Sequence, residues 1–141
     1  MALGARASSV EALERAYRSV VQNLNENDRV LIVAERAGEI VGMAQLARSS
    51  ADNARHRAEV QRVAVAADVR GAGVGKLLMQ AVEDQARGRG LTLLWLTTHA
   101  ETDACAFYEA VGYTQLGVMP RYSTRPDGRL APAAFYYREL A

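Results

Sequence analysis

The sequence is poor in the residues that make disulfides and metal sites. Its 141 residues include one cysteine, Cys105, and two histidines, His56 and His99. A single thiol cannot form a disulfide within the chain, and these three residues do not match the ligand spacing of a zinc site. We therefore expect no bound metal. We interpret Cys105 as a small core residue, because no histidine is spaced to activate it as a nucleophile.

Long apolar segments and an excess of one charge are also missing. No apolar run approaches the roughly 20 residues of a membrane-spanning helix, and the opening MALGARASSVEAL lacks the apolar centre of a secretory signal. The formal net charge is +1. Two local arginine clusters, Arg55–Arg57 and Arg87–Gly90, are interpreted as solvated surface. The sequence thus predicts a cytoplasmic protein that binds neither a membrane nor a nucleic acid.

Half of the residues are hydrophobic, which suits a single domain spanning residues 1–141. Apolar residues at helical spacing follow a capping box that begins at Ser8, and apolar runs on both sides of Ala37 and Gly38 indicate an antiparallel hairpin. A later strand, helix and nearly continuous apolar strand indicate a right-handed crossover. The predicted helices are Ser8–Asn25, Gly73–Arg87 and Thr102–Val111, and the predicted strands are Arg29–Arg36, Glu39–Arg48, Glu59–Ala66, Leu91–Thr98, Tyr113–Val118 and Ala133–Leu140.

The segment VRGAGVG, Val69–Gly75, places four small residues between a predicted strand and a predicted helix. A P-loop would need glycine at Arg70 and a hydroxyl at Leu77, so that motif does not match. A dinucleotide fingerprint starting at Gly71 would need its third glycine at Lys76, and it does not match either. Bare backbone at a helix N-terminus still suits a pyrophosphate, because unpaired amides and the helix dipole favour an anion. A tight strand-to-helix turn is the alternative interpretation.

The same segment is similar to the coenzyme A signature Arg/Gln-x-x-Gly-x-Gly/Ala of the GCN5-related N-acetyltransferase (GNAT) family, with Arg70, Gly73 and Gly75 at its defined positions. FYEAVGY, Phe107–Tyr113, resembles the family's phenylalanine-tyrosine helix, which closes at a glycine. Within the family, four segments resemble the small-molecule acetyltransferases of the tabtoxin resistance type. These segments are AEVQRVAV, RGAGVGKLLM, AFYEAVGYT and TRPDGRLAPAAFYYREL.

The resemblance implies the GNAT fold, an α/β fold with a mixed central sheet, antiparallel N-terminal strands and a β-α-β crossover that carries the coenzyme site. It also implies that the family's first strand and helix are absent, because nothing before Ser8 matches them. Acetyl-CoA is the implied cosubstrate, with its pyrophosphate on the Gly71–Lys76 backbone and its pantetheine paired with the Val63–Val65 main chain. The implied coenzyme-binding residues are Val63, Ala64, Val65, Arg70, Gly71, Ala72, Gly73, Val74, Gly75 and Lys76.

The resemblance also assigns two catalytic roles. Glu59 stands where several family members carry a glutamate, and it is the expected base that deprotonates the acceptor amine. Tyr108, on the phenylalanine-tyrosine helix, is the expected acid that protonates the leaving thiolate. Proteins of the tabtoxin resistance type carry an aspartate where this chain has Thr97. Glu101 and Asp103, in the following loop, are therefore the substitute candidates for the base.

The acceptor is expected to be a primary amine of a small molecule, such as an amino-acid-like toxin or antibiotic. A mixed-charge loop could contact the carboxylate and the amine of an amino acid together, or could be merely solvated. Its residues are Arg121, Tyr122, Arg125, Asp127 and Arg129, and the nearby Phe135, Tyr136 and Tyr137 suit strand packing or a homodimer contact. Acetylation of a protein N-terminus or lysine, and a non-catalytic acyl-CoA-binding module, are the alternative functions.

Overall fold

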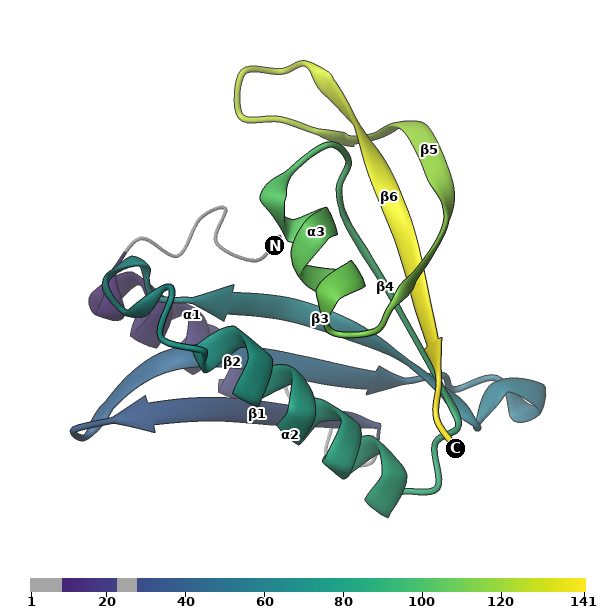
Figure 1. Ribbon diagram of the computed structural model, residues 1–141, viewed down its shortest axis with the longest axis horizontal. Coiled ribbons are helices and arrows are strands. Elements are labelled where there is room, and N and C mark those ends of the chain that lie inside the picture. The colour runs from purple at the N-terminus through teal and green to yellow at the C-terminus, as the bar shows by residue number, and fades with distance from the viewer. Residues whose placement is uncertain (1–8, 23–27) are drawn as a thin grey trace.

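The computed structural model describes residues 9–22 and 28–141, and within them the predicted order of helices and strands is confirmed (Figure 1). Ser8 and residues 23–25, the ends of the first predicted helix, lie outside the described residues. The elements are α1 (Val10–Gln22), β1 (Arg29–Arg36), β2 (Glu39–Arg48), β3 (Arg57–Val65), α2 (Val74–Gly88), β4 (Leu93–His99), α3 (Asp103–Ala110), β5 (Thr114–Thr124) and β6 (Leu130–Glu139), with short 3₁₀ turns at Asp52–Ala54 and Ala67–Val69.

The strands form one six-stranded mixed sheet in the order β1-β2-β3-β4-β6-β5. Only β3 and β4 pair in parallel, because α2 carries the chain between them, and every other neighbouring pair is antiparallel. The β1–β2 hairpin turns at Ala37 and Gly38, whose φ angles of 52° and 82° suit the two central positions of a tight hairpin turn. The mixed sheet, the N-terminal antiparallel strands and the crossover are thus confirmed. The predicted absence of a strand and a helix before Ser8 concerns residues outside those described.

The last two strands are longer than the sequence predicts. β5 continues to Thr124, past the predicted end at Val118, and β6 begins at Leu130 rather than Ala133. β5 is an edge strand whose residues are almost all exposed, so it lacks the apolar alternation that marks a strand in the sequence. Its backbone pairing with β6 decides its length.

The sheet opens between β3 and β4, and this opening positions the site. The parallel ladder contains three residue pairs and ends where Glu59 faces Trp95. On its other edge β4 pairs with β6 over its whole length, and Figure 1 shows β4, β5 and β6 turning away from the plane of β1, β2 and β3. A bulge also interrupts the pairing of β3 with β2 at Arg62, whose φ is 55°. The β4-facing edge of β3 is therefore left without a strand partner from Val60 onward.

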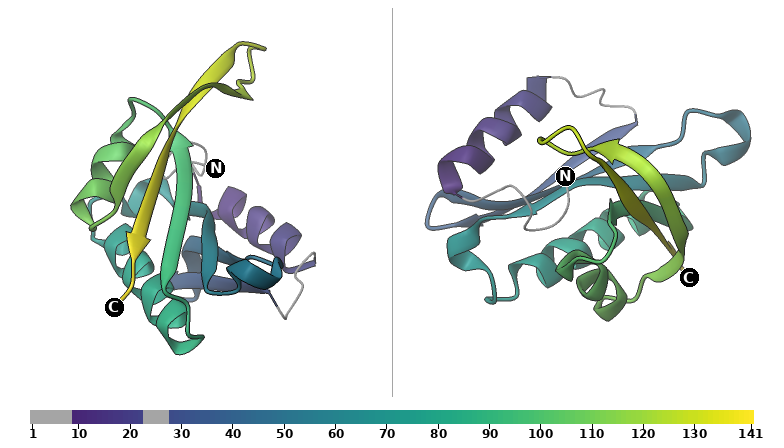
Figure 2. Two further views of the ribbon diagram at one scale, coloured as in Figure 1. Left: turned by 90° about the vertical axis from the view of Figure 1, so that its right-hand side faces the viewer. Right: turned by 90° about the horizontal axis from the view of Figure 1, so that it is seen from above.

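Helices cover both faces of the sheet. Figure 2 shows α1 on one face and α2 and α3 on the other. The α1 face buries Leu13 completely, while α2 buries an apolar stripe against the strands. That stripe contains one charged residue, Glu83, which is 7% exposed. Its Oε2 forms an ion pair with Nη1 of Arg138 on β6, at 3.3 Å. Arg138 also donates to the Val111 carbonyl, so one guanidinium joins α2, β6 and the end of α3.

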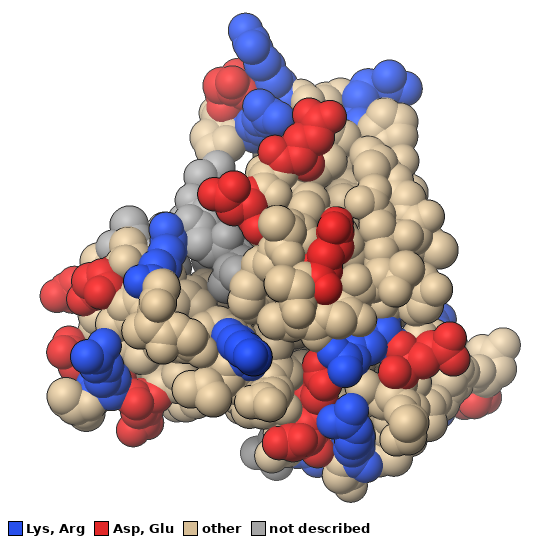
Figure 3. All heavy atoms as spheres, viewed as in Figure 1, with Lys and Arg blue, Asp and Glu red and all other residues tan. Residues whose placement is uncertain are grey.

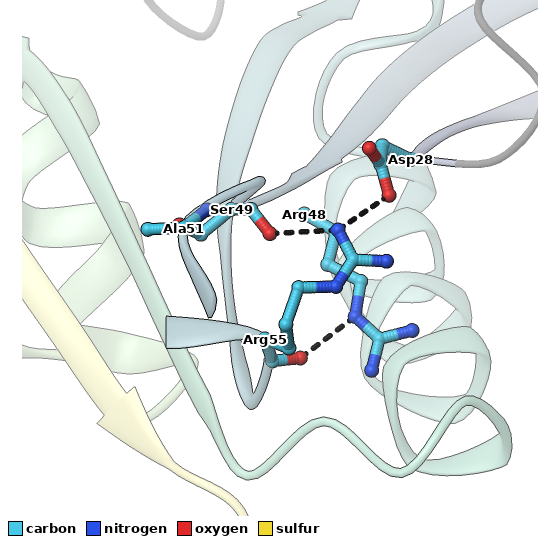
Figure 4. Close-up of polar contacts among 5 residues, drawn as sticks. All are labelled: Asp28, Arg48, Ser49, Ala51 and Arg55. Carbon is cyan, nitrogen blue, oxygen red and sulfur yellow. Dashed lines mark hydrogen bonds and ion pairs between the residues drawn. The ribbon is translucent and has the colours of Figure 1, made fainter. Parts of the chain in front are cut away.

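A polar cluster holds the connection from β2 to β3 (Figure 4). Arg55 Nη1 lies 2.7 Å from Asp28 Oδ1 and donates to the Ser49 carbonyl at 2.9 Å. Arg48 Nε donates to the Arg55 carbonyl at 2.7 Å, so both arginines close the same loop. The interpretation of Arg55 as merely solvated is therefore wrong. Its interactions fix the start of β3 at Arg57, two residues before Glu59.

Candidate functional site

Each glycine of the VRGAGVG segment has its own structural reason. Gly71 and Gly73 have φ angles of 85° and 81°, in the left-handed region that L-residues adopt only with strain, and a Cβ at either position would meet nothing within 4 Å. Gly75 is different, because a Cβ there would lie 3.1 Å from the ring of Phe107 on α3. Gly71 and Gly73 therefore shape the loop, while Gly75 lets α3 approach α2 closely.

The loop presents unpaired amides at the start of α2. Gly73 is the N-cap of the helix and has no side-chain oxygen that could cap it. The Leu77 amide donates to the Gly73 carbonyl, which closes the first helical turn. The amides of Val74, Gly75 and Lys76 precede that turn and have no acceptor within the helix. The positive end of the helix dipole adds to these donors, so the arrangement suits a diphosphate group.

These amides face a cavity of about 540 Å³ between the loop and α3. Of the ten residues predicted to bind the coenzyme, Ala72, Val63 and Ala64 do not line this cavity. Ala64 is fully buried, and Val63 lines a different cavity. The lining consists of Val65, Val69, Arg70, Gly71, Gly73, Val74, Gly75, Lys76, His99, Thr102, Asp103, Ala104 and Phe107.

A second cavity, of about 320 Å³, lies in the opening between β3 and β4. It brings together Glu59 and Tyr108, the two predicted catalytic residues, with Thr97 of β4. Val60, Gln61, Arg62 and Val63 complete the lining. Consecutive α3 residues serve the two cavities, Phe107 the first and Tyr108 the second. On β3, Val65 lines the first cavity and Val63 lines the second. The unpaired edge of this strand therefore runs from one cavity to the other.

Glu59 is half-buried and held in place by a neighbour that the sequence did not single out. Gln61 Nε2 donates to Glu59 Oε1 at 2.8 Å, and Arg29 Nη1 donates to Gln61 Oε1 at 3.2 Å. Residues two apart in a strand share a face, and this period could have drawn attention to Gln61. Its distant partner Arg29 is 32 positions away, and only the sheet brings the two together. Among the described residues, the second oxygen of Glu59 has no hydrogen-bond partner, and Glu59 lines the second cavity.

Tyr108 is nearly buried and lines the second cavity. Its side chain is 2% exposed and packs edge-on against Phe107 and Tyr113, with ring centroids 5.2 and 6.0 Å away. Burial raises the pKa of Tyr108 well above its ordinary value of 10, because the phenolate would lose its hydration. Tyr108 is therefore neutral at physiological pH and can donate a hydrogen bond into the cavity.

The substitute bases and the mixed-charge loop are placed elsewhere. Asp103 lines the first cavity, and the exposed Glu101 lines neither cavity. The loop forms its own turn, in which Asp127 accepts from the Arg129 amide at 2.9 Å. Arg121 and Tyr122 lie in β5 rather than in the loop as predicted, and none of the five residues lines a described cavity.

The aromatic residues of β6 and the lone cysteine have ordinary packing partners. Phe135 stacks on Trp95 at 6.3 Å and meets Tyr122 edge-on at 5.5 Å. Tyr136 is buried and donates to Glu109 Oε2 at 2.7 Å. Strand packing thus accounts for these side chains, and a homodimer contact stays a prediction. Cys105 is half-buried, and its Sγ lies 3.4 Å from the His99 carbonyl oxygen.

Charged side chains of both signs are spread over the face drawn in Figure 3, while most of the exposed large apolar side chains lie on β5 and β6, at Leu116, Val118, Met119, Tyr122 and Leu130. On the face shown in Figure 3, Lys and Arg alternate with Asp and Glu, and neither sign forms a continuous field. Among the described helices, none has both the length and the apolar character needed to cross a bilayer. Within residues 9–22 and 28–141, no three His, Cys, Asp or Glu side chains gather closely enough to hold a metal ion.

Comparisons with known proteins agree with this arrangement. The model of the acetyltransferase (GNAT) family matches residues 5–113. IAA acetyltransferase of Azospirillum brasilense is 32% identical over 107 residues, which cover 75% of this chain and 68% of that protein. N-alpha-acetyltransferase 80 of Mus musculus is 44% identical over 78 residues, which cover 55% of this chain and 23% of that protein.

Solved structures show the same fold. Ribosomal-protein-alanine N-acetyltransferase from Brucella melitensis superposes with a TM-score of 0.77 at 26% identity, covering 89% of this chain and 78% of that one. The yncA protein of Salmonella typhimurium, solved with acetyl-CoA, has a TM-score of 0.73 at 23% identity, covering 89% and 71%. The closer similarity to the tabtoxin resistance type stays a prediction. Because the family match spans well over half of the chain, and these relatives share its fold, the chain belongs to the acetyltransferase (GNAT) family.

Proposed function

We propose that this chain transfers the acetyl group of acetyl-CoA to a primary amine of a small molecule, by direct attack within a complex that holds both substrates. The observation that carries the proposal is the unpaired edge of β3, which joins the cavity at the α2 amides to the cavity that contains Glu59 and Tyr108. A long cosubstrate with a diphosphate at one end and a thioester at the other matches this layout.

The residues present suit acetyl-CoA. The free amides of Val74, Gly75 and Lys76 would hold the diphosphate, with Arg70 at the same cavity. The peptide groups of Val63–Val65 face no strand on the β4 side, and the amide-rich pantetheine can pair with them as an added strand. Ala72 does not line the cavity and its amide already donates to the Val69 carbonyl, so the proposal assigns it no contact with the coenzyme.

In the reaction, the amine nitrogen attacks the thioester carbonyl carbon. The C–N bond forms, the C–S bond breaks, and the bonding pair leaves on sulfur. An acceptor that arrives as an ammonium ion loses two protons. Glu59 takes the first, directly or through water, and passes it to solvent, while the second balances the proton that the sulfur acquires. The products are an N-acetyl amine and the free thiol of coenzyme A.

Tyr108 would act on the leaving sulfur as a hydrogen-bond donor. Its raised pKa makes complete proton transfer to a thiolate unfavourable, since an ordinary thiol has a pKa of about 8.5. A neutral phenol in a nearly dry site still stabilises negative charge as it develops on sulfur. This modifies the role expected from the sequence, in which Tyr108 delivers the proton itself.

Acetylation of a protein N-terminus is the second candidate. It is favoured by the names of the mouse and Brucella relatives, which specify an N-alpha and a ribosomal-protein-alanine acetyltransferase. The second cavity, at about 320 Å³, is near the lower end of the usual size for small-molecule sites, which favours a small acceptor.

The test measures thiol release from acetyl-CoA with small primary amines and with short peptides that have free N-termini. We expect the amines to be acetylated, and Glu59→Gln and Tyr108→Phe each to lower kcat by about 100-fold. Glu39→Gln and Tyr113→Phe are matched controls, because Glu39 is exposed at the start of β2 and Tyr113 is as buried as Tyr108, and neither lines a described cavity.

Each other result has a definite meaning. Turnover of peptides alone would establish the second candidate. Tight binding of coenzyme A with no turnover of any amine or peptide would indicate an acyl-CoA-binding module. Unchanged rates in Glu59→Gln and Tyr108→Phe would remove the assigned roles of these residues.

A further inference from the structure

Arg62 occupies a strained position at the wall of the second cavity. Its φ of 55° lies in the left-handed region, which is uncommon for any residue other than glycine or asparagine. It sits at a bulge, because Gln61 pairs with Gln45 and Ala64 pairs with Met43, so that Arg62 and Val63 together face one β2 residue. Glycine is the usual residue at the left-handed position of such a bulge. Strain of this kind is commonly found at functional sites.

The charge of Arg62 has no partner among the residues that the structure describes. In the described residues 9–22 and 28–141, no hydrogen bond or ion pair engages its guanidinium, and its side chain is exposed. Glu59 lines the same cavity, but the two side chains do not form an ion pair within 4.0 Å. Glu59 Oε1 instead accepts a hydrogen bond from Gln61 Nε2 at 2.8 Å. A separated cation and anion thus share one small cavity.

We infer that Arg62 selects acceptors that carry an oxyanion, a carboxylate or a phosphonate, beside the amine that is acetylated. A guanidinium binds such a group with two parallel hydrogen bonds. The amine would lie toward Glu59 and the oxyanion toward Arg62, so the charges of the cavity complement those of an amino acid. This inference rests on the proposed function, and it assigns acceptor recognition to β3 rather than to the Arg121–Arg129 loop.

The substitution Arg62→Gly removes the charge and suits the backbone. Glycine adopts the observed φ without strain, so we expect the variant to fold at least as stably as the natural chain. Arg121→Gly is the matched control, because Arg121 is also an exposed arginine with a φ of 52°, and it lines neither of the two cavities. Both variants relieve similar strain, and only one changes the cavity.

The experiment compares acceptors that differ in the anionic group alone. Amino acids with increasing distance between amine and carboxylate, their carboxamides and their phosphonate analogues are assayed by thiol release at saturating acetyl-CoA. We expect the natural chain to prefer an oxyanion-bearing acceptor over its carboxamide. In Arg62→Gly, the KM for that acceptor should rise roughly 10- to 100-fold, while the KM for the carboxamide and the affinity for coenzyme A stay unchanged. The carboxylate and phosphonate arms identify which oxyanion is preferred.

Four outcomes would contradict the inference. These are equal turnover of the acid and the carboxamide, an unchanged KM in Arg62→Gly, an equal rise in KM for both acceptors, and the same rise in Arg121→Gly, which would return recognition to the loop. Failure of the proposed function is a different result, because then no amine in the panel, with or without an oxyanion, releases the thiol.

Discussion

The contribution of the α2 amides can be tested at Gly73, which caps the helix and lines the first cavity. An L-residue in the left-handed region costs about 1–2 kcal/mol, and valine is stiffer than most because it is branched at Cβ. In Gly73→Val the loop has two responses. If the peptide keeps its φ of 81°, the new side chain stands in the open space of the cavity, where nothing lies within 4 Å of a Cβ. If the peptide rotates, the amides turn away.

Either response lowers the affinity for acetyl-CoA. If the free loop relaxes, binding must restore the strained conformation; because 1.4 kcal/mol corresponds to a factor of ten, this cost amounts to about a 5- to 30-fold loss of affinity. Lys76 offers a comparison, since it lines the same cavity but is an exposed charge. Such a charge contributes about 0.2–1 kcal/mol, so Lys76→Ala should weaken binding by no more than about fivefold.

Isothermal titration with coenzyme A measures both effects, and urea unfolding shows whether each variant is folded. Gly88→Ala is the control within the same helix, because Gly88 ends α2 without a positive φ and with nothing within 4 Å of a Cβ. Its affinity should be unchanged. A folded Gly73→Val variant that binds as tightly as the natural chain, or a Lys76→Ala loss as large as that of Gly73→Val, would refute binding through the main chain and leave the glycines as a turn.

Three further predictions concern the supports of the site. Gln61→Leu removes the donor that holds Glu59 Oε1, and we expect a lower kcat with unchanged coenzyme affinity. Gln61→Glu, which cannot donate when ionised, should not restore kcat. Burial raises the pKa values of Tyr108 and Tyr113 above 10. The unfolded chain releases these protons near pH 10 and the folded chain retains them, so the free energy of unfolding should be constant with respect to these groups below pH 10 and fall as the pH rises beyond it. Urea unfolding at pH 9 and 11 checks this, and a Tyr108→Phe, Tyr113→Phe double variant should show a weaker fall. Arg138→Met leaves the nearly buried Glu83 with Arg87 as its remaining ion-pair partner, at 3.7 Å. We expect the free energy of unfolding to fall by about 2–3 kcal/mol, and the added substitution Glu83→Leu to recover part of this loss. If the double variant recovers nothing, the loss comes from packing of the arginine stem.

Local patterns were enough to predict most of the elements. The helical spacing in α2, the apolar runs of β1 to β4 and the turn at Ala37 and Gly38 are short-range signals, and the structure confirms each of them. The predicted β5 is too short, because an exposed edge strand needs no apolar alternation when a neighbouring strand supplies its hydrogen bonds.

The candidate site divides in the same way. The glycine segment and the phenylalanine-tyrosine pair lie within a few positions of one another, so their spacing could be recognised in the sequence. The bulge at Arg62 could not be recognised in the sequence, because RVAV contains no glycine or proline to mark it. The bulge exists only in the pairing of β3 with β2. The Arg29–Gln61–Glu59 chain likewise joins strands far apart in sequence.

The sequence by itself determined the order of the elements, the left-handed glycines and the family, because these depend on residue type and short-range spacing. Tertiary structure decided where β3 and β4 part, which residues share the two cavities, and that Glu59, Arg62 and Tyr108 meet in one of them. Strand pairing and helix packing bring these groups together across long stretches of chain, and no local pattern encodes the distance between them.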